Sequence, residues 1–512
     1  MMLTIARFRS SAPVAGASIG LIGALALLWF TRRGPLTLPP LAYLDALGAF
    51  FVFAVWVGTA LSSALHTPSE HGWRFWLTAL ALTVGFLTSQ TPVIVAVYVL
   101  VALMHASLLR RSNLSATLRS AGIPLLAAAA LTSGYGALAL RGAVRFDAPF
   151  AGAALDSFTF WFVLLAAVIP LLPSGALAGD MGFETISHSP PTRPATRVAD
   201  GGMPGLPARE GVDLFAFAWL YPLMRLYTLS PWNEGWSFAA IALGGGAMLW
   251  LTLGALTATV HSHRAERHRR RMLALALAGI GLSSGAGLAA GCYAVLVSML
   301  LVVTEDPESA TELNSSATVW GFPPSVPSWL LSGAFPMTAP FIAAWMIIGA
   351  GAAGGVTVLT AVTWLTMLVG ALPTVIDTPA TASTRRWIGG GISLALGIAS
   401  PLVVHFLIQP VIEQLQGGLS VYGDINVCPW IGLTMVNSAR TGITTLPTIG
   451  AAGLMVVLSA MVYLLSRLLR PKPEIGSSSP ASTASDEVLN DLCRAVPWLG
   501  EATTKAPDHD DR

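Results

Sequence analysis

Long apolar runs separated by short polar breaks dominate the hydrophobic pattern of this chain. Each run is about 16 to 25 residues long, the length that a helix needs to cross roughly 30 Å of hydrocarbon. The runs lack the period-two alternation of membrane β-strands. The pattern therefore predicts an all-α integral membrane protein with about fourteen transmembrane helices. The predicted spans are 14–30, 41–64, 75–89, 92–109, 121–140, 157–177, 212–229, 236–260, 271–286, 287–303, 327–350, 352–373, 387–409 and 447–467.

Two polar segments divide the chain into four parts. Residues 178–210 are rich in Pro, Gly, Ser and Arg, a composition typical of a disordered loop. This loop separates the N-terminal helices of residues 1–177 from the C-terminal helices of residues 211–467. Residues 468–512 begin with Pro and Ser and end acidic, which predicts a tail that is mostly disordered.

The composition agrees with a membrane protein and excludes a soluble one. The chain is 54% hydrophobic and 11% charged, whereas soluble domains are about 25% charged. We therefore expect the lipid bilayer as its surroundings and, with a net charge of +2, no nucleic-acid partner. The three cysteines lie far apart and no spacing of metal ligands is present, so we predict no metal, no cofactor and no catalytic residue.

The basic residues predict how the chain is oriented. Placing the N-terminus in the cytoplasm puts most loop arginines on the cytoplasmic side, as the positive-inside rule requires. The basic segment His261–Arg271 then forms a cytoplasmic hinge between two spans. The first span is followed by Arg32 and Arg33 instead of a cleavage site, so we read it as retained. We expect a multi-pass protein of the cell membrane with both termini in the cytoplasm.

Ionisable side chains inside spans are costly, so the few present are candidates for a proton path. Arg225 follows Pro222, which removes one helical hydrogen bond. A broken helix with a cation beyond the break would line a polar cavity; the commoner alternative is an arginine that reaches to the membrane surface. Asp213 and Asp156 each precede a span, where a helix N-terminus favours an acidic residue. We include Asp213 and Arg225 among the proton-path candidates.

His405 lies in an otherwise apolar span, which makes it the titratable group that we expect to be most buried. His405, Gln409 and Glu413 are spaced four residues apart and share one helix face if Pro410 only kinks the helix. A histidine near its ordinary pKa of about 6.5 passes protons readily. We therefore name His405 and Glu413 as proton-path candidates; a packed, hydrogen-bonded histidine is the commoner alternative.

Two further ionisable residues lie near the ends of predicted spans. We expect Asp45, four residues into the second span, to be solvated at the membrane surface. We expect the same of His105, which is close to Arg110 and Arg111. Runs of glycine at 244–246, 351–355 and 389–391 predict surfaces on which helices pack closely.

Five segments resemble a known family, the antiporter-like membrane subunits of respiratory complex I, membrane hydrogenases and Mrp antiporters. They are Leu44–Phe53, Val163–Pro173, Phe217–Arg225, Trp236–Leu282 and Gly333–Trp345. Phe217–Arg225 is similar to the family span that ends in a tyrosine and an arginine, and Trp236–Leu282 to the glycine-rich span, basic turn and following helix. The resemblance covers roughly residues 40 to 410 and implies an antiporter-like bundle.

The resemblance also shows where the chain departs from the family. The family's proton path carries a glutamate, lysines and a histidine, and the matching positions here are the apolar Leu100, Leu165, Leu172 and Phe217. Lysine occurs only at 472 and 505, both in the tail, so the later membrane lysines have no counterpart either. Asp45 and Arg225 do match the family by position.

Two functions compete on this basis. The resemblance implies a non-catalytic subunit of an NADH-quinone oxidoreductase-like or antiporter complex, with other membrane subunits as partners and quinone contacted through them. Such a subunit would either translocate protons through substitute groups or support assembly. The alternative is a stand-alone multi-pass transporter or a lipid-handling membrane protein. An enzyme acting on lipid-linked substrates usually carries clustered charges in a large external loop. The largest predicted external loop here, residues 410–446, holds only three charged residues, Glu413, Asp424 and Arg440, which argues against such an enzyme.

Overall fold

The computed structural model describes residues 2–457 with gaps, and the chain divides into the units Met1–Val456 and Val457–Arg512. The predicted loop 178–210, the predicted span 447–467 apart from Gly453 and Val457, the tail and Asp213 lie outside the described residues. The gaps are 33, 39–41, 66–72, 109–113, 143–144, 147–154, 173–213, 258–260, 305–325, 333–334, 336, 377–383, 420–425, 431–432, 439–441, 447–452 and 454–456.

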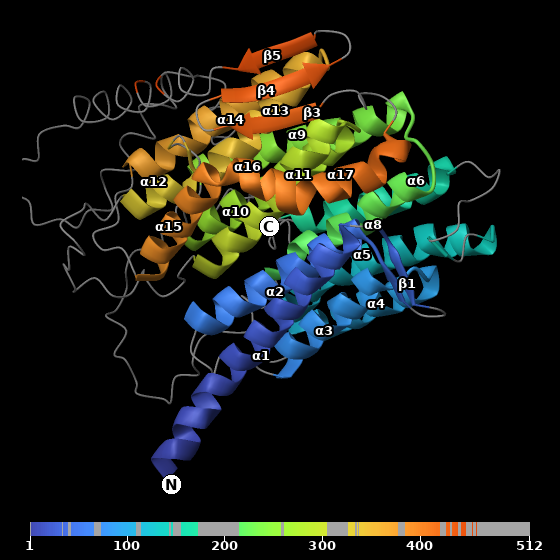
Figure 1. Cartoon of the computed structure of the whole chain (residues 1–512), viewed down its shortest axis with the longest axis vertical. Coiled ribbons are helices and arrows are strands. Elements are labelled where there is room, and N and C mark those ends of the chain that lie inside the picture. The colour runs from blue at the N-terminus through green and yellow to red at the C-terminus, as the bar shows by residue number, and fades with distance from the viewer. Residues whose placement is uncertain are drawn as a thin grey trace, which may run out of the picture. The chain divides into compact units, whose positions relative to one another are not determined.

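Helices of the N-terminal half pack against their neighbours in chain order, from α1 to α6 (Figure 1). A short antiparallel hairpin of β1 (Leu36–Leu38) and β2 (Ala42–Leu44) joins α1 to α2. Asp156 caps α6, because its carboxylate accepts from the Thr159 amide at 3.4 Å, which confirms its predicted place before a helix. The helices are α1 (Met2–Thr31), α2 (Ala46–Leu65), α3 (Trp73–Leu87), α4 (Thr91–Leu108), α5 (Leu114–Leu140) and α6 (Ser157–Val168), extended by η2 (Ile169–Leu171).

Three consecutive helices pack together: α9 (Glu234–Thr257), α10 (His261–Gly281) and α11 (Gly285–Thr304), with α10 in contact with both of the others. Every residue of α11 is buried. The turn between α10 and α11 contains Ser283 with a φ of 46°, so the predicted split near this residue is confirmed. A Cβ on Gly279 would lie 2.7 Å from the Gly287 carbonyl oxygen, so these glycines let the two helices touch.

The C-terminal half contains a helix that bends by 73° between α15 and α16. A π-helical turn, η8 (Val404–Ile408), follows, and Pro410 continues the helix as α17 without ending it. A three-stranded antiparallel sheet of β3 (Asn426–Trp430), β4 (Leu433–Ser438) and β5 (Gly442–Leu446) lies within the predicted external loop, with β3 against α11, α13 and α16 (Figure 1). The helices are α12 (Val326–Ser332), α13 (Ala339–Ala353), α14 (Thr357–Ile376), α15 (Thr384–Ile398), α16 (Ser400–Val403), α17 (Gln409–Leu415) and η9 (Gln416–Gly418).

The structure confirms an all-α membrane fold and corrects several spans. Helices occur at every predicted span that the structure describes, and five of them are long and apolar enough to cross a membrane by themselves. The predicted spans 212–229, 327–350 and 387–409 are each broken into shorter helices. Proline explains the breaks: Pro222, Pro340 and Pro401 each lie in the first turn of a new helix, where their missing amide costs nothing.

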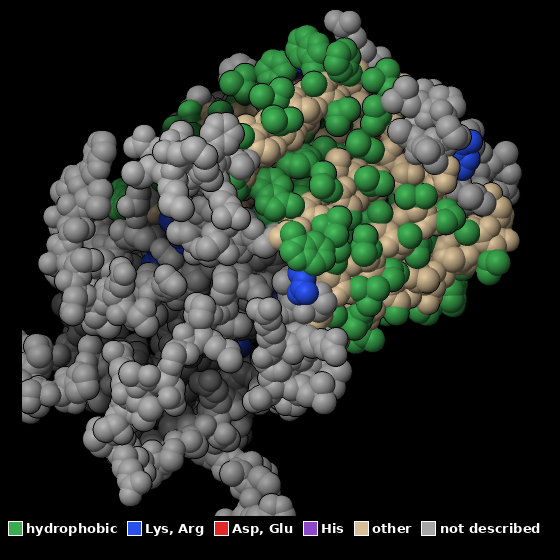
Figure 2. All heavy atoms as spheres, turned by 90° about the horizontal axis from the view of Figure 1, so that it is seen from below, with side chains coloured by type: hydrophobic (Ala, Val, Ile, Leu, Met, Phe, Trp, Pro, Cys, Tyr) green, Lys and Arg blue, Asp and Glu red, His purple; other side chains and the backbone are tan. Residues whose placement is uncertain are grey.

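Hydrophobic side chains cover the described part of the outer surface shown in Figure 2, where Lys and Arg form only small patches. Large apolar residues of α1 and α3, such as Ile19, Trp29 and Val84, are more than half exposed. Exposing so extensive an apolar surface to water would be unfavourable. The surface suits contact with lipid or with another membrane protein.

Candidate functional site

The break at Pro222 places Arg225 at the centre of the bundle. The chain here runs as three short turns, η4 (Ala216–Leu220), α8 (Tyr221–Arg225) and η5 (Leu226–Thr228). All residues of α8 are buried, and Arg225 has no exposed surface. The expectation that Arg225 reaches to the membrane surface is therefore wrong; the expectation of a broken helix is confirmed.

Arg225 forms a buried ion pair with Asp45, which stands at the N-terminus of α2. Two guanidinium nitrogens donate to the two carboxylate oxygens, one of them at 3.1 Å. The exposed fractions of the two side chains are 0% and 2%. The prediction that Asp45 is solvated is wrong, because the helix break moves a matching cation next to it. Pairing two charges in this fork geometry is what offsets their removal from water.

Further hydrogen bonds hold the two side chains of this pair. The Arg225 Nε donates to the Tyr221 hydroxyl at 2.8 Å, and that hydroxyl donates to the Phe86 carbonyl at the end of α3. The Gly48 amide donates to Asp45 at 2.7 Å, as in a helix N-cap. A Cβ on Gly48 would collide with the Phe86 carbonyl oxygen, so glycine is required for α2 and α3 to approach here.

Gln414 extends the network to the bent C-terminal helix. Its amide nitrogen donates to the second oxygen of Asp45 at 2.7 Å. Its amide oxygen accepts from the Leu47 backbone at 2.9 Å. One side chain of α17 therefore satisfies both the carboxylate and the first turn of α2, so α2, α8 and α17 meet at Asp45. Gln414 was not among the predicted site residues, because it lies 369 residues from Asp45 and no local sequence signal joins the two.

Tyrosines from neighbouring helices donate to two carbonyls at the break, one of which, that of Ala218, also accepts from the Tyr221 backbone amide. The hydroxyl of Tyr98 on α4 donates to the Ala218 carbonyl at 2.5 Å. The hydroxyl of Tyr135 on α5 donates to the Pro222 carbonyl at 2.9 Å. A broken helix in a membrane requires such replacement partners. We define the buried network as Asp45, Tyr98, Tyr135, Tyr221, Arg225 and Gln414.

Of the other proton-path candidates, the structure describes His405 and Glu413, and neither belongs to the buried network. His405 and Glu413 are exposed, so His405 is not the most buried titratable group as predicted, since the π-helical turn directs it outward. Its Nε2 lies 3.2 Å from a guanidinium nitrogen of Arg32. Gln409 donates to Glu413 at 3.2 Å, which confirms that these two residues share a helix face. Asp213 lies outside the described residues.

His105 is buried on α4, with 3% of its surface exposed, so the predicted place at the membrane surface is wrong. Of the apolar residues at the family's charged positions, Phe217 is buried, whereas Leu100 and Leu165 are 40% and 47% exposed on the outside of the bundle. Among the described residues, no three His, Cys, Asp or Glu side chains come together as metal ligands.

The basic segment His261–Arg271 is helical and begins α10, so it is not a hinge as predicted. His268 lies in the polar first half of this helix. Its Nδ1 is 2.8 Å from a nitrogen of Arg271 and its Nε2 is 3.1 Å from the Leu331 carbonyl on α12. Burial, with a smaller contribution from nearby Arg271, lowers the pKa of His268 to about 3. The neutral ring therefore accepts from Arg271 and donates to Leu331.

Comparison with known proteins finds structural relatives only. No family model and no curated protein matches the sequence. A chain of the Mrp complex from Dietzia sp. DQ12-45-1b superposes with a TM-score of 0.62 at 13% identity, covering 81% of this chain and 95% of that one. A chain of respiratory complex I from Thermus thermophilus with bound NADH gives a TM-score of 0.61 at 15% identity, covering 80% and 95%.

A third similar structure is the membrane-bound sulfane sulfur reductase, an archaeal respiratory membrane complex, with a TM-score of 0.55 at 14% identity and coverage of 98% and 96%. At these identities the likeness concerns the fold. The chain therefore has the fold of an antiporter-like membrane subunit, which confirms the resemblance found in its sequence.

Proposed function

We propose that this chain is an antiporter-like subunit of a multi-subunit membrane complex, of redox or antiporter type, and that it supports assembly instead of carrying protons. The fold it shares with chains of three such complexes supports membership. Other membrane subunits would then be its partners, and quinone would be contacted only through them. We also propose the orientation derived from the loop arginines, with both termini in the cytoplasm.

The observation that supports the assembly role is that both oxygens of Asp45 already accept hydrogen bonds within the buried network. Asp45 is held by Arg225, Gln414 and the Gly48 amide, so its oxygens are committed to fixed donors. A proton carrier has to exchange partners and change charge, whereas an arginine stays protonated. The network therefore fits a structural role, in which it holds α2, α8 and α17 together.

The apolar replacements support the same role. Leu100, Leu165, Leu172 and Phe217 cannot bind protons, and the buried helices α11 and α13 contain no Asp, Glu, His, Lys or Arg. Translocation through His405 and Glu413 is the alternative within the same family. Both side chains are exposed on the bundle, where a partner subunit would have to cover them to build a path.

Affinity purification of the tagged chain in mild detergent, followed by mass spectrometry, tests membership. We expect membrane subunits of a redox or antiporter complex to copurify in fixed proportion. Asp45→Asn, which weakens the buried network, should lower this proportion. Arg141→Gln, which removes an exposed ion pair, should not. Recovery of the chain alone as a monodisperse species would contradict membership and favour a stand-alone transporter.

A further inference from the structure

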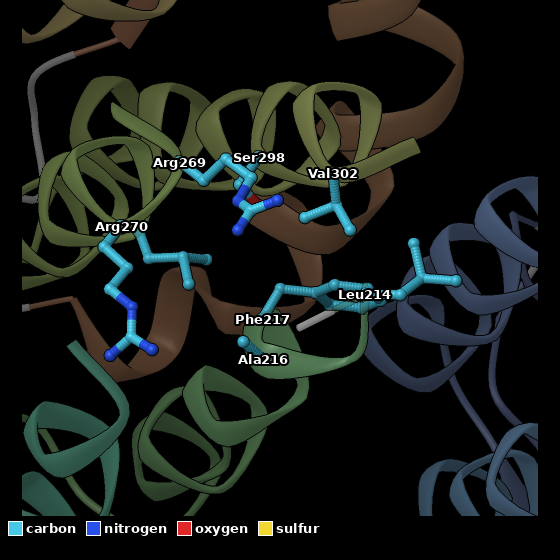
Figure 3. Close-up of a pocket in the computed structure, with 8 residues that line it drawn as sticks. Leu214, Ala216, Phe217, Arg269, Arg270, Ser298 and Val302 are labelled. Atoms are coloured by element: carbon cyan, nitrogen blue, oxygen red, sulfur yellow. The ribbon is translucent and has the colours of Figure 1, made fainter. Parts of the chain in front are cut away.

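The interior beside the basic half of α10 has little room for a ligand. The cavity between α10, α11 and η4 has a volume of about 20 Å³, and Phe217, Arg269 and Arg270 line it (Figure 3). A cavity needs roughly 10 to 15 Å³ to hold one water molecule, so an organic ligand does not fit here. The outer surface of the bundle offers more room for one.

Arg32 is an exposed cation at the end of α1. The apolar part of this helix, Pro13–Thr31, is 19 residues long, and only 17% of this stretch is buried inside the protein. A helix of this length rises about 28 Å, close to the thickness of the hydrocarbon core of a bilayer. Arg32 therefore lies at the level of the lipid phosphate groups, whichever way the chain is oriented in the membrane.

Two side chains of the π-helical turn η8 contact the guanidinium group of Arg32. One of its nitrogens lies 3.2 Å from Nε2 of His405, and this ring nitrogen accepts the hydrogen bond because an arginine can only donate. The guanidinium carbon lies 4.9 Å from the centre of the Phe406 ring, a cation–π contact. An arginine has five N–H donors, so most of them remain available for a ligand.

The positive charge of Arg32 has no carboxylate partner among the described residues. Residues 1 to 44 contain no Asp or Glu, and Asp45 is committed to the buried network. On the facing helix, the acidic residue nearest to His405 in sequence is Glu413, which lies eight residues away, or about 12 Å along the helix. The surface around Arg32 therefore attracts an anion from its surroundings.

Exposed apolar side chains accompany Arg32 on both helices. On α1, Leu25 and Trp29 are 48% and 61% exposed, and their spacing of four and three residues places them on the same helix face as Arg32. On the bent helix, Leu402 and Phe406 are 59% and 49% exposed. A tryptophan close to a membrane surface is typical of residues that contact lipid head groups. A cation at the end of an apolar helix face matches a phospholipid, which joins an anionic head group to apolar chains.

We propose that Arg32, together with Trp29 and Phe406, binds the head group of an anionic phospholipid whose acyl chains lie along α1. A guanidinium group binds a phosphate through two parallel N–H···O bonds, which the available donors of Arg32 permit. The bound lipid would hold the end of α1 next to η8. The site shares no residue with the buried network, and it does not depend on the proposed membership of a complex.

Native mass spectrometry of the purified full-length chain, with lipids added back in mild detergent, tests the site. Phosphatidylglycerol should bind several-fold more tightly than phosphatidylcholine, whose positive choline group is repelled by Arg32. Arg32→Gln should weaken phosphatidylglycerol binding at least about tenfold, as loss of a charge-assisted hydrogen bond implies. Arg141→Gln, which removes an exposed arginine on the same predicted side of the membrane, should leave this affinity unchanged.

Equal affinities of the natural chain and Arg32→Gln, or of the two lipids, would overturn the proposal. Displacement of the lipid by an equal concentration of glycerol 3-phosphate would also overturn it and assign the site to free phosphate. If Arg32→Gln does not fold, a photoreactive benzophenone side chain in place of Trp29, activated in native membranes, provides the second measurement. Adducts with phosphatidylglycerol are expected there. Adducts with protein alone would contradict the site, because a neighbouring subunit would then cover this surface.

Discussion

Asp45 is the residue on which the buried network depends most. Replacing it by asparagine keeps the shape and the cap on Gly48 but leaves the Arg225 charge without a counter-ion. Removing one partner of a buried ion pair costs about 3 to 5 kcal/mol. We expect Asp45→Asn to lower the free energy of unfolding by this amount, measured by chemical or thermal unfolding in detergent micelles.

Arg141→Gln is the matched control, because Arg141 pairs with Asp156 at 3.0 Å but is 52% exposed. Exposed pairs contribute about 0 to 1 kcal/mol. The double variant Asp45→Asn with Arg225→Met should be more stable than Asp45→Asn alone, since it removes the isolated charge. Equal losses for Asp45→Asn and Arg141→Gln would contradict the importance of the buried pair.

Tyr98 and Tyr135 each donate a hydrogen bond to one backbone carbonyl of the broken helix. Tyr135→Phe removes the only donor described for the Pro222 carbonyl while keeping the ring, and a buried acceptor without a partner costs about 1 to 3 kcal/mol. We expect a loss of stability in this range. Tyr98→Phe should cost less, because the Ala218 carbonyl still accepts from the Tyr221 backbone amide. Phe162→Leu on α6 tests whether any aromatic change has the same effect. No loss in Tyr135→Phe would contradict this account of the break.

Among the elements, the α10 and α11 hairpin depends on glycine. A Cβ at Gly279 would lie 2.7 Å from the Gly287 carbonyl oxygen and 3.0 Å from the Gly291 amide, both backbone atoms that cannot move alone. Gly279→Val should therefore destabilise the chain by about 1 to 3 kcal/mol or more through overpacking. Gly246→Val on α9 is the control, because nothing lies within 4 Å of its Cβ position. Similar losses for both variants would contradict a role for close packing.

The first half of α10 gives a pH dependence. The folded-state pKa of His268 is about 3, below the value of about 6.5 in an unfolded chain. Below pH 6.5 the unfolded chain binds a proton that the folded chain does not. The free energy of unfolding therefore decreases as the pH is lowered from about 6.5 to about 3. His268→Asn should flatten this slope, measured by unfolding between pH 7 and pH 4, and His405→Asn, at an exposed position, serves as the control. An unchanged slope in His268→Asn would exclude this origin.

The sequence predicted the elements better than the contacts between them. Apolar length and proline are local signals, so the spans and the break at Pro222 could be recognised before the structure was known. The contacts of Asp45 could not be recognised in this way, because its partner Arg225 lies 180 residues further along the chain and Gln414 lies 369 residues further along. His405 was misplaced for a related reason: composition shows that a residue lies in an apolar span, but the π-helical turn decides the face on which it lies.

At the scale of the whole molecule, the question is whether the bundle conducts protons. A proton path needs a chain of titratable groups or water across about 30 Å of hydrocarbon. In the described part of the chain, the oxygens of the central Asp45 accept hydrogen bonds from fixed donors, and apolar residues stand at the positions where the family carries charges. The isolated chain is therefore expected to seal the membrane.

Reconstitution into liposomes that contain a trapped pH-sensitive dye measures this directly. After a pH jump with a potassium diffusion potential, we expect the chain to dissipate the proton gradient no faster than protein-free liposomes. His405→Ala and Glu413→Gln should leave this rate unchanged, because both groups are exposed on the bundle surface. A rate several-fold above the protein-free background that falls in either variant would instead assign proton conduction to these residues, since loss of one relay group interrupts a single file of proton carriers.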